Sequence, residues 1–261
     1  LSAPLLLPAD APSQPTSLGG GRYQVEQLIG EGSRKRVYRA HDTRLDRTVA
    51  LAIVKTEGLD AAGLDRVRRE TRAMGRLGDH PNLVTVYDVG DDGGRPFIVS
   101  QHLSGGDVEQ LLRVSPDHRL PLARSVLIAA DVSAALAHAH AHDTVHRDVK
   151  PGNVWLNDDG SARLGDFGLA AVAESSRLTT EGMIIGTVAY LPPEQAIGRL
   201  PDPRSDLYSL GAMLYELIAG RPPFVGDDAV AVISQHLHTA PVASSGHNPA
   251  VPAVLESLVL A

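Results

Sequence analysis

Several segments between residues 22 and 100 alternate apolar and polar residues. They are rich in β-branched and aromatic residues, and turn-forming stretches such as DTRLD and DDGG separate them: YQVEQLI, RVYRA, TVALAIV, VTVYDV and PFIVS. A period of two residues is typical of strands that bury one face. We therefore expect an antiparallel sheet of about five strands in this part of the chain.

Helical spacing interrupts this pattern once and dominates the rest of the chain. Residues 59–77 place Val67, Met74 and Leu77 on one partly apolar face, which predicts a helix. Beyond the strands the pattern is mostly helical, and the longest candidate helices are 121–142 and 204–219.

The two patterns together predict an α+β fold with two lobes. Residues 21–103 are expected to form a small lobe, a five-stranded antiparallel sheet with one helix, and residues 104–261 a larger, mainly α-helical lobe. Residues 1–20 are rich in proline, serine, alanine and glycine and carry almost no charge, which predicts a flexible linker or a cut N-terminal segment.

Composition narrows the classes of function that the chain can serve. The chain has 261 residues, 43% of them hydrophobic, and a net charge of -7. The acidic balance argues against nucleic acid as the main partner, and no run of apolar residues approaches the roughly 20 needed to cross a bilayer. The absence of cysteine excludes a disulfide framework and fits a cytoplasmic protein.

A glycine-rich stretch, LIGEGSRKRVY, joins the first two predicted strands at residues 28–38. It follows the phosphate-loop pattern GxGxxGxV at Gly30, Gly32 and Val37, but Lys35 stands where the pattern has its third glycine. On its own this stretch is explained equally well as a hairpin turn that uses the flexibility of glycine.

Three further motifs follow the glycine-rich stretch in a fixed order. They are HRDVKPGN at residues 146–153, DFG at 166–168 and PPE at 192–194. All four have the order and spacing of a protein kinase. From about Arg22 to its end, the chain resembles the bacterial serine/threonine protein kinases of eukaryotic, or Hanks, type. The resemblance implies a bilobal kinase fold that transfers the γ-phosphoryl group of ATP, with Mg2+, to serine or threonine hydroxyls of a protein substrate.

The resemblance gives chemical roles to four residues of these motifs. Asp148 accepts or orients the proton of the substrate hydroxyl, and Lys150 contacts the γ-phosphate. Asn153 and Asp166 supply oxygen ligands for Mg2+, a hard cation that amide carbonyl and carboxylate groups bind well. The alternative, a solvated loop of mixed charge, does not explain why the amide and both carboxylates coincide with the motif positions.

The third predicted strand lacks the lysine that the family carries there. By the family's usual interval the motif Val-Ala-x-Lys falls on residues 49–52, so that Ala52 stands in place of the lysine. Lys55 follows three residues later. Since side chains alternate across a strand, Lys55 is expected to point away from the face that Ala50 and Ala52 share. A slip or bulge in this strand would reverse that orientation.

The same alternation predicts that Lys35 enters the cleft. Lys35 precedes Val37 by two residues, so that both side chains share one side of the strand while Arg34 and Arg36 face solvent. A lysine reaches roughly 6 Å, enough to bring its ammonium group near the α- and β-phosphates. This placement is similar to that of the with-no-lysine kinases, whose lysine also stands at the third glycine position. Glu70 of the predicted helix then becomes the expected ion-pair partner. The alternatives are a solvated turn lysine and a surface carboxylate.

Alignment with the family implies further contacts with the nucleotide. Ser100 corresponds to the gatekeeper, and the backbone of the hinge, residues 101–103, meets the adenine. Trp155 occupies a floor position where an aliphatic residue is commoner, so that it either stacks under the adenine or packs in the core. The nucleotide-binding residues expected from the resemblance are Gly30, Gly32, Val37, Ala50, Gln101, Leu103, Asp107 and Trp155.

Two structural features implied by the resemblance lie outside the nucleotide pocket. One is a column of stacked side chains between the lobes, anchored by Asp206 and made of Met74, Val86, His146 and Phe167. The other concerns Glu194, whose arginine partner in the family lies beyond the point where this chain stops. We therefore expect a truncated fragment of a larger multidomain protein, or another partner for Glu194.

The segment between Asp166 and Glu194 offers hydroxyl groups that a kinase can phosphorylate in itself. Thr179 and Thr180, within ESSRLTTEGM, are the candidates, and Arg147 is available to pair with a phosphate. Autophosphorylation would bring two copies of the chain together.

Two other functions stay open on the sequence alone. A pseudokinase would use the same fold as a nucleotide-binding or scaffolding domain, because the strand lysine is lost. A kinase-like enzyme could also phosphorylate a small molecule. His138 and His142 in AHAHAH have a spacing that suits a metal on a helix, but no cysteine or carboxylate completes such a site.

Overall fold

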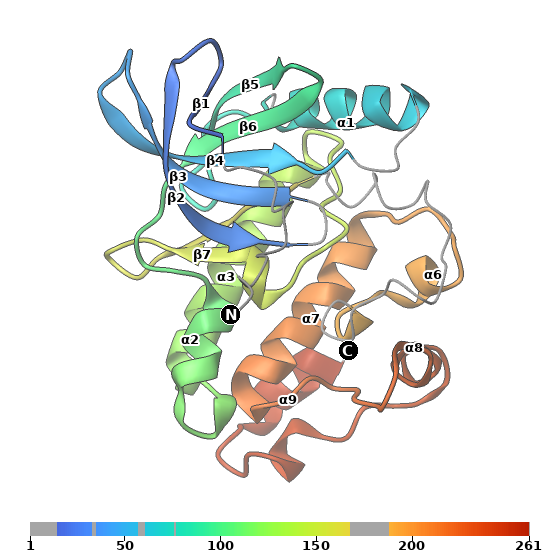
Figure 1. Ribbon diagram of the computed structural model, residues 1–261. Coiled ribbons are helices and arrows are strands. Elements are labelled where there is room, and N and C mark those ends of the chain that lie inside the picture. The colour runs from blue at the N-terminus through green and yellow to red at the C-terminus, as the bar shows by residue number, and fades with distance from the viewer. Residues whose placement is uncertain (1–14, 33–34, 57–60, 76, 168–187, 261) are drawn as a thin grey trace, which may run out of the picture.

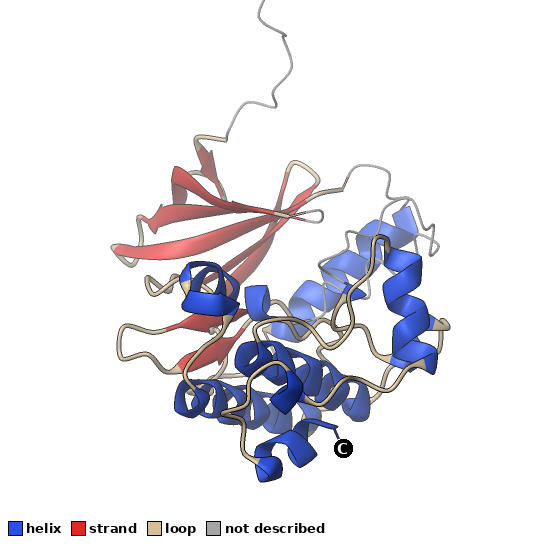
Figure 2. Cartoon of the chain, turned by 90° about the horizontal axis from the view of Figure 1, so that it is seen from below, coloured by secondary structure: helices blue, strands red, loops and turns tan. Residues whose placement is uncertain are grey.

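The chain folds into a lobe built on an antiparallel sheet and a larger lobe built on helices (Figures 1 and 2). The computed structural model describes most of the chain, with the side chains at 61, 66 and 70–74 left out: residues 15–32, 35–56, 61–75, 77–167 and 188–260. The predicted α+β bilobal class is confirmed.

One sheet of six strands forms the small lobe, with the spatial order β1-β2-β3-β4-β6-β5 and antiparallel pairing throughout. Helix α1 packs beside β5 and β6. The elements of this lobe are β1 Ser17–Leu18, β2 Tyr23–Glu31, β3 Lys35–Asp42, β4 Arg47–Val54, α1 Ala61–Met74, β5 Val86–Asp92 and β6 Arg95–Gln101. The five predicted strands and the predicted helix are all present.

The two-residue strand β1 was not predicted. It lies within residues 1–20, so the expectation of a flexible linker is wrong for Ser17 and Leu18. Leu18 is fully buried with Tyr23 and Phe97, in an apolar cluster on one face of the sheet. Burial of one such side chain contributes about 1.5–3 kcal/mol, which outweighs the weak local preference of a segment rich in small and polar residues.

Helices build the large lobe, and a short hairpin of β7 with β8 lies under the sheet of the small lobe (Figures 1 and 2). Its elements are α2 Val108–Val114, η1 Pro116–His118, α3 Leu122–His140, η2 Pro151–Asn153, β7 Val154–Leu156, β8 Ala162–Leu164, α6 Pro193–Ala196, α7 Pro203–Ala219, α8 Ala229–His238, η3 Ser244–Gly246 and α9 Ala253–Leu260. The two long predicted helices are confirmed as α3 and α7.

Local chemistry fixes both ends of α7. Asp202 caps the first turn by accepting from the Arg204 N–H, and Ser205 completes a capping box with it. The helix ends at Gly220, which has φ 84°. A Cβ atom there would lie 2.4 Å from the carbonyl oxygen of Asp117, so that only glycine fits.

Helix α3 is the apolar centre of the large lobe. The segment Leu122–Ala141 is long and apolar enough to cross a membrane, but core helices of soluble proteins pass the same test of length and composition. Here Ile128, Val132 and Leu136 are buried, and the helix packs against α7 and β8. These contacts identify α3 as a core helix.

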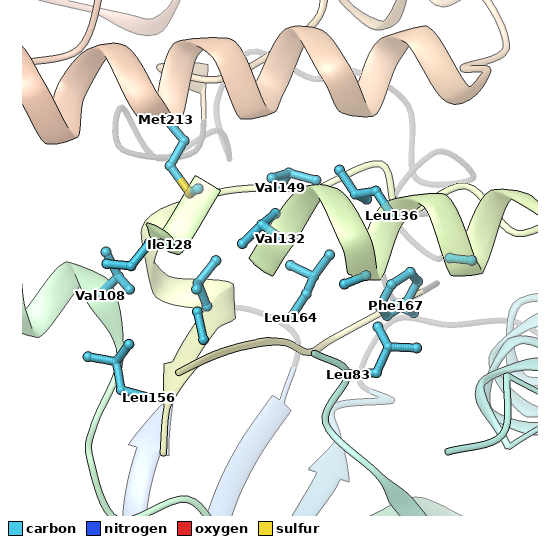
Figure 3. Close-up of a cluster of buried hydrophobic side chains, with 14 of the residues drawn as sticks. Leu83, Val108, Ile128, Val132, Leu136, Val149, Leu156, Leu164, Phe167 and Met213 are labelled. Atoms are coloured by element: carbon cyan, nitrogen blue, oxygen red, sulfur yellow. The ribbon is translucent and has the colours of Figure 1, made fainter. Parts of the chain in front are cut away.

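A continuous apolar core connects the two lobes below the sheet. Figure 3 shows Leu83, Leu164 and Phe167 close together beside α3, and the same cluster includes Ala52 and Ile98 of the sheet. Because strands and helices share this core, the segments between them are held in fixed positions at the junction of the lobes.

Candidate active site

A cavity of about 290 Å³ lies where the two lobes meet. The sheet, the hinge and the β8 end of the large lobe all contribute to its wall. Among its lining residues are Ile29, Lys35, Val37, Ala50, Ala52, Ile98, Ser100, Gln101, Leu103, Trp155, Gly165, Asp166 and Phe167. Apolar walls with a few polar groups are typical of a nucleotide or small-molecule site.

Three of the predicted catalytic residues, Asp148, Lys150 and Asn153, are brought together beside this cavity. The Lys150 ammonium group lies 2.8 Å from Oδ2 of Asp148. The amide Nδ2 of Asn153 donates to the main-chain oxygen of Asp148 at 2.7 Å and to its Oδ2 at 3.1 Å. The loop therefore holds one carboxylate between a cation and an amide, with its orientation fixed by both.

Asp206, in the first turn of α7, fixes the backbone that precedes this carboxylate. Its side chain is fully buried and accepts from the main-chain N–H groups of His146 at 2.8 Å and Arg147 at 2.7 Å. Nε2 of His140 donates to it at 2.7 Å. Arg147 has φ 72°, a left-handed conformation that costs a residue with a side chain about 1–3 kcal/mol. The three hydrogen bonds hold the loop in that conformation.

His146 connects the catalytic loop to the magnesium motif. Its Nε2 donates to the Gly165 carbonyl at 2.7 Å, while its Nδ1 accepts from the Asp148 N–H at 3.2 Å. Its ring contacts Phe167 edge to face, with 4.4 Å between centroids. Contact between these two rings agrees with the predicted column, whose member Met74 has a side chain outside the described residues.

Asp166 lies at the inner end of the cavity and forms an ion pair with the Lys35 ammonium group. Burial alone would raise the pKa of this carboxyl, but the charge and hydrogen bond of Lys35 bring it below the ordinary value. Like Arg147, Asp166 has a left-handed backbone, with φ 66°.

Strand register explains why Lys35 reaches the cavity. Lys35 is the first residue of β3 and pairs with Val54, while Val37 pairs with Ala52. The pairing of β3 with β4 runs without a bulge from this end to Asp42. Lys35 and Val37 therefore lie on the same face as Ala52, and all three line the cavity.

Lys55 lies on the other side of the sheet. Its ammonium group is 2.8 Å from Oε1 of Glu31, and the Arg36 Nε is 3.0 Å from the same oxygen. Among the residues that the structure describes, Lys55 is not part of the cavity wall. The slip or bulge that would have turned Lys55 inward is absent from the described β4 ladders.

The remaining predicted nucleotide residues divide into two groups. Ala50, Gln101, Leu103 and Trp155 line the cavity, as predicted. The Trp155 indole packs against Gly165, where an added Cβ would lie 3.4 Å from the ring.

Three of the predicted nucleotide-binding residues do not line the cavity. Asp107 is buried at the N-terminus of α2, accepts from the Gln110 N–H at 2.7 Å, and has a pKa raised by burial. Neither Gly30 nor Gly32 lines the wall, although the Gly32 N–H closes the hairpin on the Lys35 carbonyl at 2.9 Å. The nucleotide-binding role of Asp107, expected from the resemblance, stays a prediction.

Three other predicted residues cannot be placed. Glu70 belongs to α1, but its side chain lies outside the described residues. Thr179 and Thr180 fall within residues 168–187, also outside them.

Asp166, which lines the cavity, and Asn153, whose main-chain oxygen accepts from the Gly165 N–H of the wall at 2.9 Å, have side chains that fit Mg2+. Nδ2 of Asn153 is used by Asp148, which leaves its amide oxygen available, and the Asp166 carboxylate provides a second oxygen donor. No group of three or more histidine, cysteine or acidic side chains placed to hold a metal occurs in the described part of the chain. A cation here would therefore depend on nucleotide phosphates for further ligands, as Mg2+ commonly does.

Two side-chain hydrogen bonds, those of His140 with Asp206 and of Glu194 with Ser205, were not predicted from the sequence. His140 was part of the repeat considered for metal binding, but it supports Asp206; its neighbours His138 and His142 are hydrogen-bonded to backbone carbonyls. Glu194 accepts from the Ser205 hydroxyl group, which gives it a partner within the chain. Neither pairing has a local sequence signal, because both partners are distant along the chain or belong to different elements.

Comparison with known proteins agrees with this geometry. The model of the protein kinase domain family matches residues 23–254. The DNA damage-responsive serine/threonine-protein kinase RqkA of Deinococcus radiodurans is 44% identical over 254 residues, which cover 95% of this chain and 37% of the relative. Serine/threonine-protein kinase PksC of Streptomyces coelicolor is 42% identical, covering 93% of this chain and 45% of the relative.

A third relative, serine/threonine-protein kinase PrkC of Bacillus subtilis, is 36% identical over 241 residues, which cover 92% of this chain and 37% of the relative. The chain thus spans less than half the length of each of these relatives. The family match covers both lobes and every motif of the site. The chain therefore belongs to the protein kinase family and carries a serine/threonine protein kinase domain.

Proposed function

We propose that this domain transfers the γ-phosphoryl group of Mg-ATP to serine or threonine hydroxyls of a protein substrate, with Lys35 in the role of the missing third-strand lysine. The observation that carries the proposal is the position of Lys35. Its ammonium group enters the cavity and pairs with Asp166, while Ala52 occupies the strand position opposite Val37.

In phosphoryl transfer the protein mainly positions the reacting groups and neutralises negative charge. Asp148 would accept or orient the proton of the substrate hydroxyl. Lys150, which lies 2.8 Å from that carboxylate, would neutralise charge on the γ-phosphate. The hydrogen bonds from Asn153 hold Asp148 in place before substrate arrives.

Lys35 would bind the α- and β-phosphates from the glycine-rich loop. Its ammonium group is held by Asp166, so that the cation lies at the end of the cavity where the phosphates would bind. When bound, Mg2+ would neutralise charge on the phosphate oxygens, and Asp166 and Asn153 would be its protein ligands. We assign Glu70 as the second carboxylate that orients Lys35.

The adenine would lie against the hinge and the Trp155 ring. Val37 and Ala50 would cover one face of the base from the sheet, and Trp155 would support the other from below. Main-chain groups of Gln101 and Leu103 would provide its hydrogen bonds.

Autophosphorylation at Thr179 and Thr180 is part of the same proposal. A second copy of the chain would be the substrate, and the Arg147 guanidinium group would bind the resulting phosphate. We place the whole protein in the cytoplasm, in signal transduction, with a protein substrate as its partner. Phosphate mapping on active enzyme tests the two sites, and phosphate confined to other positions would reject them.

The main rival is a pseudokinase that binds nucleotide without transfer. Purified chain would be incubated with ATP, Mg2+ and a generic protein substrate, and Asp148→Asn would be measured in parallel. We expect transfer to serine and threonine by the unmodified chain, loss of transfer in Asp148→Asn, and nucleotide binding by both. Binding without transfer in the unmodified chain would establish the rival, and phosphate found only on small molecules would exclude a protein kinase.

A further inference from the structure

Three charged residues join the ends of three neighbouring strands beside the glycine-rich stretch. Glu31 ends β2, Arg36 is the second residue of β3, and Lys55 directly follows β4. Both cations contact Oε1 of Glu31, at 3.0 Å from the Arg36 Nε and 2.8 Å from the Lys55 Nζ. We call these three residues the strand clasp.

The clasp lies on the face of the sheet opposite the cavity. Glu31 pairs with Arg36 across β2 and β3, one residue beyond Lys35. Because side chains alternate, Arg36 points to the clasp and Lys35 to the cavity. Lys35 pairs with Val54, the residue before Lys55. The clasp therefore connects the end of β2 and the end of β4 to the start of β3, where Lys35 lies.

The electrostatics of Glu31 agree with its contacts to both cations. Its pKa is held below the ordinary value, first by the hydrogen bond from Lys55 and then by that from Arg36. The carboxylate is thus ionised at neutral pH and attracts both cations. The side chain of Lys55 is 26% exposed and that of Glu31 44%, so solvent weakens the attraction without abolishing it.

A phosphate-binding lysine displaced to the end of a strand gains more from such support than one inside a strand. A lysine at position 52 would stand inside β4, where ladders continue in both directions along the strand. Lys35 instead is the first residue of β3, so its backbone is held at the end of the ladder with Val54 and by the hydrogen bond from the Gly32 N–H. The position of its ammonium group depends on how firmly the start of β3 is held.

We propose that Lys55 is a positioning residue, which acts through Glu31 to hold the start of β3 and thereby the ammonium group of Lys35 in the cavity. The inference rests on the proposed function of Lys35. It gives Lys55 a role in nucleotide binding without contact with phosphate.

The test compares ATP binding and steady-state kinetics of the full chain carrying Lys55→Met, Glu31→Gln, or both. We expect each single variant to raise the dissociation constant and the KM for ATP by about 2- to 5-fold, the range of a partly exposed ion pair, with kcat little changed. The double variant should be no worse than Glu31→Gln alone, and Lys55→Arg should restore most of the affinity.

The chain offers a matched control on the same hairpin. Arg39 of β3 pairs with Glu26 of β2 at 2.8 Å, with a cation more exposed than Lys55 and away from the start of β3. Arg39→Met should leave ATP binding unchanged. An equal loss of affinity in Arg39→Met and Lys55→Met would overturn the proposal, because any surface pair of the hairpin would then have the same effect.

A second comparison separates positioning from general stability. In the Lys35→Met background, Lys55→Met should cause no further loss of ATP binding, since Lys55 acts through Lys35. A full additional loss there would contradict the proposal, as would unchanged binding in the single variant Lys55→Met. If instead Lys35→Met alone leaves ATP binding and transfer unchanged, the proposed function of Lys35 fails, and the clasp proposal fails with it.

Discussion

Replacement of Asp206 tests how the catalytic loop is held. Asp206→Ala removes one fully buried carboxylate that accepts from the His146 N–H, the Arg147 N–H and Nε2 of His140. None of these donors can turn to solvent without a shift of the loop or of α3. The left-handed backbone of Arg147 also loses the contact that compensates for its strain.

The magnitude follows from the cost of unsatisfied buried donors. Each one costs about 1–3 kcal/mol, and loss of one partner from a buried charged network typically costs about 3–5 kcal/mol in total. Since a domain of this kind is stable by about 5–15 kcal/mol, Asp206→Ala is expected to remove about a fifth or more of the free energy of unfolding.

Urea unfolding measures this loss, with Asp206→Asn as the conservative comparison. The amide keeps one oxygen acceptor, so Asn is expected to cost less than Ala. Leu207→Ala, at an exposed position of the same helix, controls for general effects of substitution in α7. If Asp206→Ala changes the free energy of unfolding by less than about 1 kcal/mol, the anchoring argument is refuted, because one net hydrogen bond is worth that much.

Three further predictions concern other residues of the small lobe and the cavity. Arg22 donates to both carboxylate oxygens of Asp42 and lowers its pKa to about 2, so this contribution to stability is present above the unfolded pKa near 4 and lost as the pH falls toward 2. Asp42→Asn should therefore flatten the acid side of the stability profile, and an unchanged profile measured by thermal unfolding would contradict the assignment. Trp155 is the single tryptophan and lines the cavity, so nucleotide binding should change the fluorescence of the protein. If the ring stacks on adenine, Trp155→Leu should weaken ATP binding by about 2- to 10-fold. Equal affinity of the variant and the unmodified chain would mean that the ring has only a packing role. Glu70→Ala should strongly lower the rate of phosphoryl transfer, while Asp65→Ala on the same helix should not, and unchanged turnover in Glu70→Ala would reject the ion pair with Lys35.

Much of the fold follows from residue patterns that act locally. Period-two alternation identified the five long strands, and the predicted helices at 121–142 and 204–219 match α3 and α7 within two residues. Local patterns could not reveal elements that depend on distant contacts. Strand β1 consists of two residues whose pairing is stabilised by burial of Leu18 against distant side chains, which no local pattern reveals.

The site shows the same division between local and distant effects. Alternation from Val37 predicted the direction of Lys35, because the unbroken ladder of β3 with β4 keeps a strict period of two. The partners of these residues depend on tertiary structure. Neither the contact of Lys55 with Glu31 nor that of His140 with Asp206 could be predicted from spacing, because the elements involved are brought together only by folding.

The most direct test of the displaced lysine is transfer of γ-phosphate from ATP, with Mg2+, by the unmodified chain, Lys35→Met and Lys55→Met on one protein substrate. Removal of a cation that stabilises the transition state should lower kcat/KM for Lys35→Met by about 100-fold or more. Lys55→Met should keep its kcat and lose only a few-fold in KM for ATP. Loss of transfer in Lys55→Met, with Lys35→Met still active, would contradict the account.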